Sequence, residues 1–185
     1  MNLAGSPLAQ RLGMAAAVAL ATSVAAWEGR RLIAYTDLAG VPTACDGITG
    51  PDVIPGKTYT NAECDALLAK NLDRHAAAAF ACITVPLADH ERVAWAHFAY
   101  NVGAVAFCGS TAARKLNAGD YAGACAEISR WTYVAGKDCR LPASGCAGIP
   151  ARRDHERAMC EGRVPIPGVF DNVIAGSAST APGKP

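Results

Sequence analysis

Uncharged, mostly small residues fill one early stretch of the chain without interruption, from Leu12 to Trp27. As a helix, this stretch of sixteen residues would be about 24 Å long at 1.5 Å per residue, shorter than a hydrocarbon core of about 30 Å. Ala, Gly, Ser and Thr outnumber Leu, Ile and Phe, so transfer into lipid gains little free energy. The pattern therefore predicts an export signal or a weak membrane anchor over residues 1–27.

Two fates are open for this segment. The triplets SVA and VAA fit the small-x-small pattern that signal peptidase favours, so an ordinary cleaved signal is one interpretation. Cleavage there would leave Glu28 at a frayed terminus, where a side chain has no fixed position. We therefore expect a retained segment that first tethers the protein and later folds against the domain.

The middle of the chain has helical periodicity. Thr60 and Glu63 form the pattern of a capping box, which predicts a helix that continues to about residue 81. Ser110 and Asp120 are suitable N-cap residues, and Pro150 suits the first turn of a helix. Four further helices are accordingly expected over residues 89–101, 110–119, 120–130 and 150–162.

The segment before these helices has strand character. RLIAY and VPTAC flank the turn sequence TDLAG, which predicts a small hairpin. The fold class is therefore α+β, with a mainly helical lobe, a small β-hairpin or sheet lobe, and the site between them. We expect three parts in the chain: the anchor over residues 1–27, a catalytic domain over 28–164 and a flexible C-terminal tail over 165–185.

Glu28, Asp37 and Thr43 are the candidate catalytic residues, because two carboxyl groups and a hydroxyl are suited to hydrolysis of a glycosidic bond. Such a reaction needs one protonated carboxylic acid to protonate the leaving oxygen and a second, ionised group to act on water or on the developing positive charge. The hydroxyl of Thr43 can orient that water. The spacing alone is weak evidence, since Glu at a helix end and Asp in a turn are common.

The surrounding residues strengthen this interpretation. Residues 27–50 resemble the signature E-G-x-R-L-x-x-Y-x-D-x-x-G-x-x-T of the phage-type lysozymes of glycoside hydrolase family 24. The matching residues here are Glu28, Gly29, Arg31, Leu32, Tyr35, Asp37, Gly40 and Thr43. FAYNVG, STAARKLNAGDY and ARRDHE are similar to later landmarks of that family and stand in the same order. Within it, Thr-x-Cys and Lys-Asp-Cys-Arg resemble the signal-arrest-release (SAR) endolysins of lambdoid-type phages.

The resemblance implies a lysozyme-like fold and an endolysin that hydrolyses the β-1,4 bond between N-acetylmuramic acid and N-acetylglucosamine in peptidoglycan, so that the host cell lyses. Glu28 would be the general acid, while Asp37 and Thr43 position the attacking water. The reaction would invert the anomeric carbon if the two carboxyls are about 6.5–9.5 Å apart. The resemblance also implies that residues 1–27 tether the protein in the inner membrane and that the protein is later released into the host periplasm.

Several residues that could support the catalytic residues have more than one interpretation. Asn101 either binds sugar or ends its helix, and Trp131 either lines a saccharide groove or belongs to the core. By resemblance, Arg153 pairs with Glu28, with Arg152 as the competing choice. Asp46 follows Thr43 closely where many members have Gly-x-Gly, and we expect it to add a carboxylate beside the site.

Two other functions remain open: a catalytically silent, membrane-tethered wall-binding protein, and a lytic transglycosylase, which would form an anhydro product without a positioned water. A pure binder has no need of Glu28, Asp37 and Thr43 together. Asp37 and Thr43 also favour hydrolysis over transglycosylation, because they can position a water molecule.

The eight cysteines predict a disulfide framework formed in an oxidising compartment, which agrees with export. Only Cys139 and Cys146 are paired by proximity. The absence of C-x-x-C and of close Cys and His pairs argues against a metal site, and we expect no cofactor. With 17 basic and 16 acidic residues, the formal net charge is +1, which gives nucleic-acid binding no support. We expect a monomer whose partner is peptidoglycan.

Overall fold

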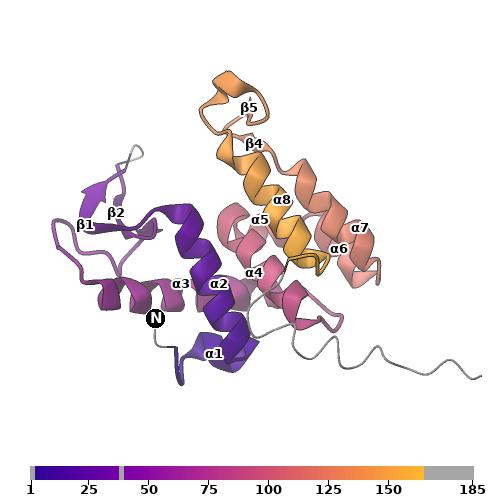
Figure 1. Cartoon of the computed structure of the whole chain (residues 1–185), viewed down its shortest axis with the longest axis horizontal. Coiled ribbons are helices and arrows are strands. Elements are labelled where there is room, and N and C mark those ends of the chain that lie inside the picture. Colours follow the sequence, from indigo (N-terminus) through magenta and orange to yellow (C-terminus); the bar gives the residue numbers. More distant parts are fainter. Residues whose placement is uncertain (1–2, 38–39, 165–185) are drawn as a thin grey trace, which may run out of the picture.

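The computed structural model describes residues 3–37 and 40–164. A small sheet lies at one side of the molecule and a cluster of helices at the other, with helix α2 (Met14–Glu28) between them (Figure 1). The α+β fold class is thereby confirmed. The predicted tail, residues 165–185, lies outside the described residues.

The N-terminal segment forms two helices, and the apolar stretch from Leu12 to Trp27 lies almost entirely in the second. Helix α1 (Pro7–Leu12) is capped by the hydroxyl of Ser6, and the chain breaks at Gly13, whose φ of 85° suits glycine. Helix α2 then packs against α4, with Leu20 and Val24 buried. Within the described residues, each helix is too short or too polar to cross a bilayer.

The predicted hairpin is present, with one strand added. Strands β1 (Arg31–Thr36) and β2 (Pro42–Cys45) pair antiparallel, and Tyr35 lies opposite Thr43. Strand β3 (Ile48–Thr49) extends the sheet beyond β2. Two residues are too few for an alternating pattern, which is why the sequence did not predict β3.

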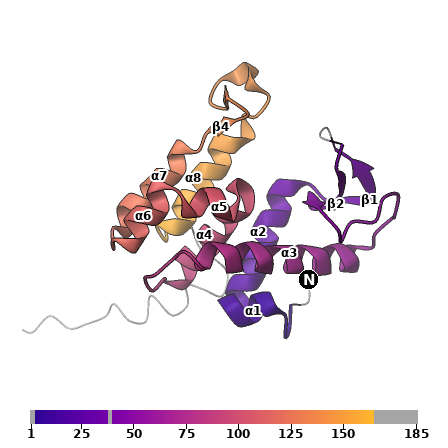
Figure 2. The same ribbon diagram turned by 180° about the vertical axis from the view of Figure 1, so that it is seen from behind.

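Helix α3 (Asn61–Phe80) connects the two lobes, as Figure 2 shows most clearly. The capping box is confirmed: Thr60 Oγ1 accepts from the backbone N–H of Glu63, and the Glu63 carboxylate accepts from the backbone N–H of Thr60. Helix α4 (Asp89–Val102) is central to the helical lobe and packs against α2, α3 and α8 (Gly148–Cys160). A buried aromatic cluster on its inner side contains Trp95, Phe98 and Phe107.

The later elements largely follow the predicted boundaries. Ser110 and Asp120 cap α6 (Thr111–Asn117) and α7 (Tyr121–Glu127) as expected. Two differences concern helix ends: α7 stops early and continues as a 3-10 turn, and α8 begins two residues before Pro150. Proline is tolerated at that third position because the first N–H groups of a helix have no partner within it. The remaining elements are α5 (Ala104–Cys108), η1 (Ile128–Arg130), β4 (Tyr133–Val134), β5 (Lys137–Asp138) and η2 (Pro142–Ser144).

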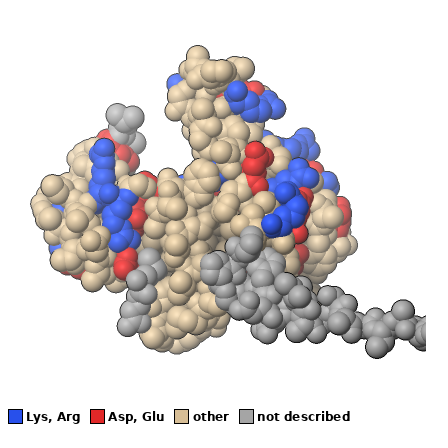
Figure 3. Space-filling model, viewed as in Figure 1, with Lys and Arg blue, Asp and Glu red and all other residues tan. Residues whose placement is uncertain are grey.

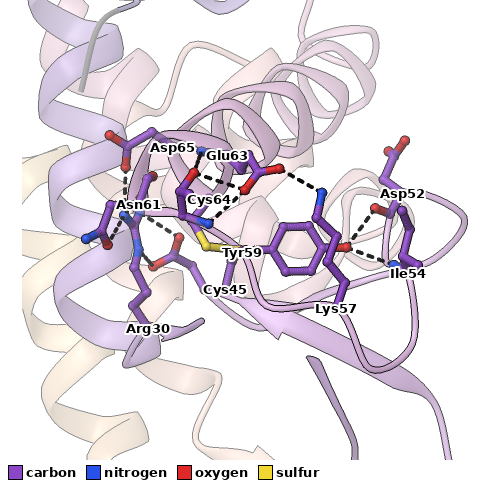
Figure 4. The surroundings of a disulfide bond; sticks show 12 residues. Arg30, Cys45, Asp52, Ile54, Lys57, Tyr59, Asn61, Glu63, Cys64 and Asp65 are labelled. Carbon is purple, nitrogen blue, oxygen red and sulfur yellow. Dashed lines mark hydrogen bonds and ion pairs between the residues drawn. A yellow bond between two sulfur atoms is a disulfide. The ribbon is translucent and has the colours of Figure 1, made fainter. Parts of the chain in front are cut away.

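All eight cysteines are paired in disulfides. The predicted pair Cys139–Cys146 is confirmed. The other three disulfides are Cys45–Cys64, Cys82–Cys108 and Cys125–Cys160. Cys45–Cys64 ties β2 to the first turn of α3, as Figure 4 shows, and so fixes the sheet on the helix that leads to the other lobe. Because the first cysteine is Cys45, α1, α2 and β1 contain no covalent cross-link.

Candidate functional site

Glu28 is the last residue of α2. Gly29 follows it in the left-handed conformation, with φ 67°, and ends the helix. The carboxyl group is partly exposed, and its Oε2 lies 3.5 Å from the point where a side chain on Gly47 would begin. Gly47 has φ 73° in the turn between β2 and β3, so glycine is favoured there by its backbone. Glu28 thus lies where α2 meets the sheet.

Arg152 is the ion-pair partner of Glu28. Its Nη2 donates to Glu28 Oε1 at 2.7 Å, and its guanidinium also lies 5.4 Å from the ring centre of Trp27. A carboxylate at the C-terminus of a helix is close to the partial negative charge of the carbonyl end, and Arg152 offsets that repulsion. The suggested pairing with Arg153 is wrong; the competing choice, Arg152, is the observed one. Consecutive residues on a helix point about 100° apart, so only one of the two can face Glu28.

Glu28 opens into a polar cavity of about 270 Å³ between the two lobes. Besides Glu28, its walls contain residues from the sheet, from α3 and from α4: Gly47, Thr49, Asn71, Arg74, His75, Tyr100 and Asn101. The cavity therefore confines a carboxyl group among hydrogen-bonding side chains. That combination suits binding of a hydroxyl-rich ligand and transfer of a proton to it.

Two titratable groups in the cavity are neutral at neutral pH. Burial raises the pKa of Tyr100, with further contributions from the charges of Glu28 and Asp46. Burial also lowers the pKa of His75, aided by the charge of Arg74. The His75 and Tyr100 rings meet edge to face with centroids 5.2 Å apart. His75 and Tyr100 therefore form an uncharged part of the cavity wall. Arg74 is the neighbouring positively charged side chain in that wall.

Asp37 and Thr43 lie next to each other across the β1–β2 turn. Thr43 Oγ1 is 3.4 Å from Asp37 Oδ2 and 3.1 Å from the Val41 carbonyl oxygen, so its single proton has two acceptors in reach. Asp37 Oδ1 accepts from the backbone N–H of Val41 at 2.9 Å. Thr43 is buried, and it faces Tyr35 in the strand register. The hairpin thus brings these two candidates together and holds the carboxylate with hydrogen bonds.

Asp46 does not add a free carboxylate to the site. Its side chain is completely buried and accepts two hydrogen bonds from Arg30, at 2.9 and 3.1 Å. Arg30 also reaches Asp65 and Asn61 at the start of α3 (Figure 4). The backbone carbonyl of Asp46 accepts from the hydroxyl of Tyr100, which lines the cavity, at 3.4 Å. The expectation of a carboxylate beside the site is therefore corrected: Asp46 fixes the β2–β3 turn on α3.

Arg153 belongs to a buried network behind the site. It contacts Asn101 Oδ1 and donates to Glu156 Oε2 at 2.6 Å, while the other oxygen of Glu156 lies 2.8 Å from His97 Nδ1. Burial lowers the pKa of Arg153. Asn101 is the one member of the network that lines the cavity. Arg153 is therefore linked to the cavity through its contact with the Asn101 side chain.

Trp131 belongs to the core and not to a saccharide groove. Its ring packs edge to face on the buried ring of Phe98, with centroids 5.4 Å apart, and it does not line the Glu28 cavity. Trp131 is thus part of the helical lobe's aromatic packing.

Four lining residues, Asn71, Arg74, His75 and Tyr100, were not predicted from the sequence. The first three are spaced at i, i+3 and i+4 on α3, so they share one face of the helix. That stripe is polar, and it borders the stripe on which Leu68 and Leu72 are buried. This amphipathic pattern was the available signal. Within the described part of the chain, no cluster of three or more His, Cys, Asp or Glu residues is arranged to hold a metal ion.

Comparisons with known proteins agree with this geometry. A family model described as phage lysozyme matches residues 25–156. The SAR-endolysin of Bacteriophage PS119 is 46% identical over 133 residues, which cover 72% of this chain and 75% of the relative. The SAR-endolysin of Escherichia phage Mu is 43% identical over 125 residues, or 68% of each chain.

Two solved structures are similar in fold. The endolysin from Escherichia coli O157:H7 phage FAHEc1 has a TM-score of 0.67 at 28% identity, covering 83% of this chain and 94% of its own. P22 lysozyme has a TM-score of 0.64 at 32% identity, covering 77% of this chain and 94% of its own.

Proposed function

Because this chain belongs to the phage lysozyme family, we propose that Glu28 is the general acid of a muramidase and that Asp37 and Thr43 position the water. The protein is a lysozyme of the endolysin class and lyses peptidoglycan. The proposed reaction cleaves the β-1,4 bond between N-acetylmuramic acid and N-acetylglucosamine. The single observation that carries the proposal is the carboxyl of Glu28 at the end of α2, facing a polar cavity.

In the proposed reaction, the protonated Glu28 carboxyl donates its proton to the glycosidic oxygen as the bond to the anomeric carbon breaks. A water molecule held by Asp37 and Thr43 attacks that carbon and gives its proton to the Asp37 carboxylate. The Thr43 hydroxyl orients this water by a hydrogen bond. The products are two glycan ends, one of which is reducing. Arg152 stabilises the Glu28 carboxylate that forms when the proton leaves.

The proposed catalytic role of Glu28 links activity to the position of α2. We propose that residues 1–27 first tether the protein in the inner membrane and that α2 docks on the body after release into the periplasm. Support comes from the small, uncharged residues of α2 and from the buried positions of Leu20 and Val24 in the docked state. A weak anchor has little free energy opposing departure from lipid.

The test is mass spectrometry of peptidoglycan digested by the oxidised protein, with Glu28→Gln and the matched control Glu161→Gln. Glu161 pairs with Arg157 and Arg163 on the surface. Reducing-end muropeptides that disappear only with Glu28→Gln are the expected result, with a loss of about 10² to 10⁴-fold in rate. Anhydro products would instead identify a lytic transglycosylase, and no products from the folded protein would identify a silent wall-binding protein.

The proposed role of Asp37 is tested separately. Asp37→Asn removes the charge that holds the water and is expected to lower kcat, while Asp154→Asn on the exposed face of α8 leaves the rate unchanged. Equal rates for the Asp37 variant and the wild type would contradict the role of Asp37 without touching that of Glu28.

A further inference from the structure

An arginine side chain, Arg74, lines the Glu28 cavity without an acidic partner among the described residues. Of the described residues in the cavity walls, Glu28 and Arg74 have a formal charge, because His75 and Tyr100 are neutral. The Glu28 carboxylate is already paired with Arg152, at 2.7 Å. The cavity therefore presents a guanidinium group to an anionic part of a ligand.

Charged neighbours of Arg74 in the sequence belong to other ion pairs. One turn earlier on α3, Lys70 Nζ lies 2.6 Å from Asp52 Oδ1. Asp73, the residue directly before Arg74, accepts from Arg11 Nε at 2.9 Å. Figure 3 shows basic and acidic side chains next to each other on both lobes. Arg74 differs from this pattern, and it does so inside the cavity.

The charge of Arg74 acts on the cavity walls. Burial lowers the pKa of His75, and the charge of Arg74 is the next cause of that shift. Burial raises the pKa of Tyr100 on α4, and the charge of Arg74 opposes this shift. Arg74 thus affects groups on both helices that line the cavity. Its own side chain is exposed, so a ligand can reach it.

Peptidoglycan carries carboxylates on one of its two sugars. N-acetylmuramic acid differs from N-acetylglucosamine by a lactyl ether, whose carboxyl is free in peptide-free glycan and is joined to the stem peptide in the intact wall. The stem peptide has free carboxylates of its own. A guanidinium can bind a carboxylate through two parallel N–H···O bonds, which gives both attraction and a preferred orientation.

We propose that Arg74 binds a carboxylate of the muramoyl unit, from the lactyl group or the stem peptide, and so makes the protein prefer strands that carry this charge. The inference rests on the proposed function, because it takes the Glu28 cavity as the place where the glycan binds. A cavity of about 270 Å³ keeps a sugar at Glu28 close to Arg74. Loss of a hydrogen bond between charged groups should weaken binding about tenfold.

Matched glycan fragments that differ in charge test this role of Arg74. The first pair consists of peptide-free fragments with lactyl carboxylates and the same fragments with these groups converted to methylamides. The second pair consists of fragments with intact stem peptides and the same fragments with the peptide carboxylates converted to methylamides. Isothermal titration calorimetry measures Kd for the full, oxidised chain with Glu28→Gln, which keeps the fragments from being cleaved. If this chain cleaves them, the proposed role of Glu28 fails, and KM replaces Kd in the same comparison.

The chain that retains Arg74 is expected to bind the charged member of at least one pair about tenfold more tightly than its methylamide. Arg74→Gln should abolish this preference. Arg114→Gln is the matched control, because it removes an exposed arginine of α6 that does not line the cavity, and it should leave the preference intact. A preference lost for the first pair alone identifies the lactyl carboxylate, and one lost for the second pair alone identifies the stem peptide.

Four results would overturn the role of Arg74. These are a preference that persists in Arg74→Gln, an equal loss of preference in Arg114→Gln, equal binding of both members of each pair by the chain that retains Arg74, and a uniform loss of affinity for all four fragments in Arg74→Gln. The last of these would assign Arg74 a structural role, which a lower Tm of that variant would show. None of the four bears on the role of Glu28, which the muropeptide digestion tests.

Discussion

Residues 3–28 and residues 45–160 are held in the fold by different kinds of interaction. The first region, helices α1 and α2, contains no cysteine and packs through buried Leu, Val and Ala side chains. Its polar ties to the rest of the molecule include Arg11–Asp73 and Glu28–Arg152. The second region contains all four disulfides. We refer to these regions as the N-terminal helices and the cross-linked body.

This difference has a physical consequence for the proposed function. Undocking of the N-terminal helices breaks no covalent bond, whereas the cross-linked body keeps its disulfides throughout. Glu28 lies at the boundary between the two, and its partner Arg152 belongs to the cross-linked body. A protein divided in this way can lose and regain a proposed catalytic residue as one helix moves. The following four predictions test the division.

The largest effect is expected inside the cross-linked body, from Arg153→Met. This change leaves the Glu156 carboxylate buried without its cation, which typically costs about 3–5 kcal/mol. Urea unfolding measures the loss. The neighbouring variant Arg152→Met is the control, since Arg152 faces the partly exposed Glu28, and it is expected to lose activity with a smaller loss of stability. Equal stability losses for the two variants would contradict the distinct roles of these adjacent arginines.

Leu20→Ala should break the contact between the two regions. Leu20 is fully buried, and truncation of a buried Leu to Ala costs about 2–5 kcal/mol. Since α2 has no cross-link, we expect the loss to appear as faster amide exchange in α2, with little change in α6 and α7. Met14→Ala is the control, because Met14 is 45% exposed. Uniform acceleration across the whole chain would show that α2 and the cross-linked body unfold together.

The contribution of a disulfide to the free energy of unfolding should increase with the length of the loop that it closes. Cys125–Cys160 and Cys139–Cys146 join residues 35 and 7 positions apart. On the chain-entropy model, their removal costs about 3.8 and about 2.4 kcal/mol, so the two double Cys→Ala variants should differ by about 1.4 kcal/mol. Chemical unfolding of both variants measures this difference. A greater loss from the shorter loop would indicate that local packing, and not loop closure, dominates.

The smallest effect is expected from pH. Burial lowers the pKa of His155 from its ordinary 6.5, with the charge of His97 as the next cause and Glu156 opposing the shift. Between the unfolded and the folded pKa, the unfolded chain binds more protons, so this contribution to stability is present above about pH 6.5 and is lost as the pH falls below it. The Tm of His155→Gln should therefore fall less between pH 7.5 and 5 than that of the wild type. An identical Tm profile would exclude a contribution from His155.

Local signals in the sequence predicted much of the fold. Capping residues such as Thr60, Ser110 and Asp120 accept from N–H groups within three positions. The local sequence is therefore sufficient to predict them. The contact between Asp37 and Thr43 follows from a hairpin with a short turn. The ends of α7 and α8 were less well predicted, because a helix end depends on what packs against its last turn.

The sequence by itself determined the class of fold, the even cysteine count and the residues Glu28, Asp37 and Thr43, which lie within sixteen positions of one another. Tertiary structure alone decided that Arg152 faces Glu28, that Asp46 is buried against Arg30 and that α3 contributes Arg74 to the cavity. The reason is geometric. Short-range order depends on neighbours along the chain, whereas the side of a helix that faces a site depends on its rotation about its axis, which only packing between distant segments fixes.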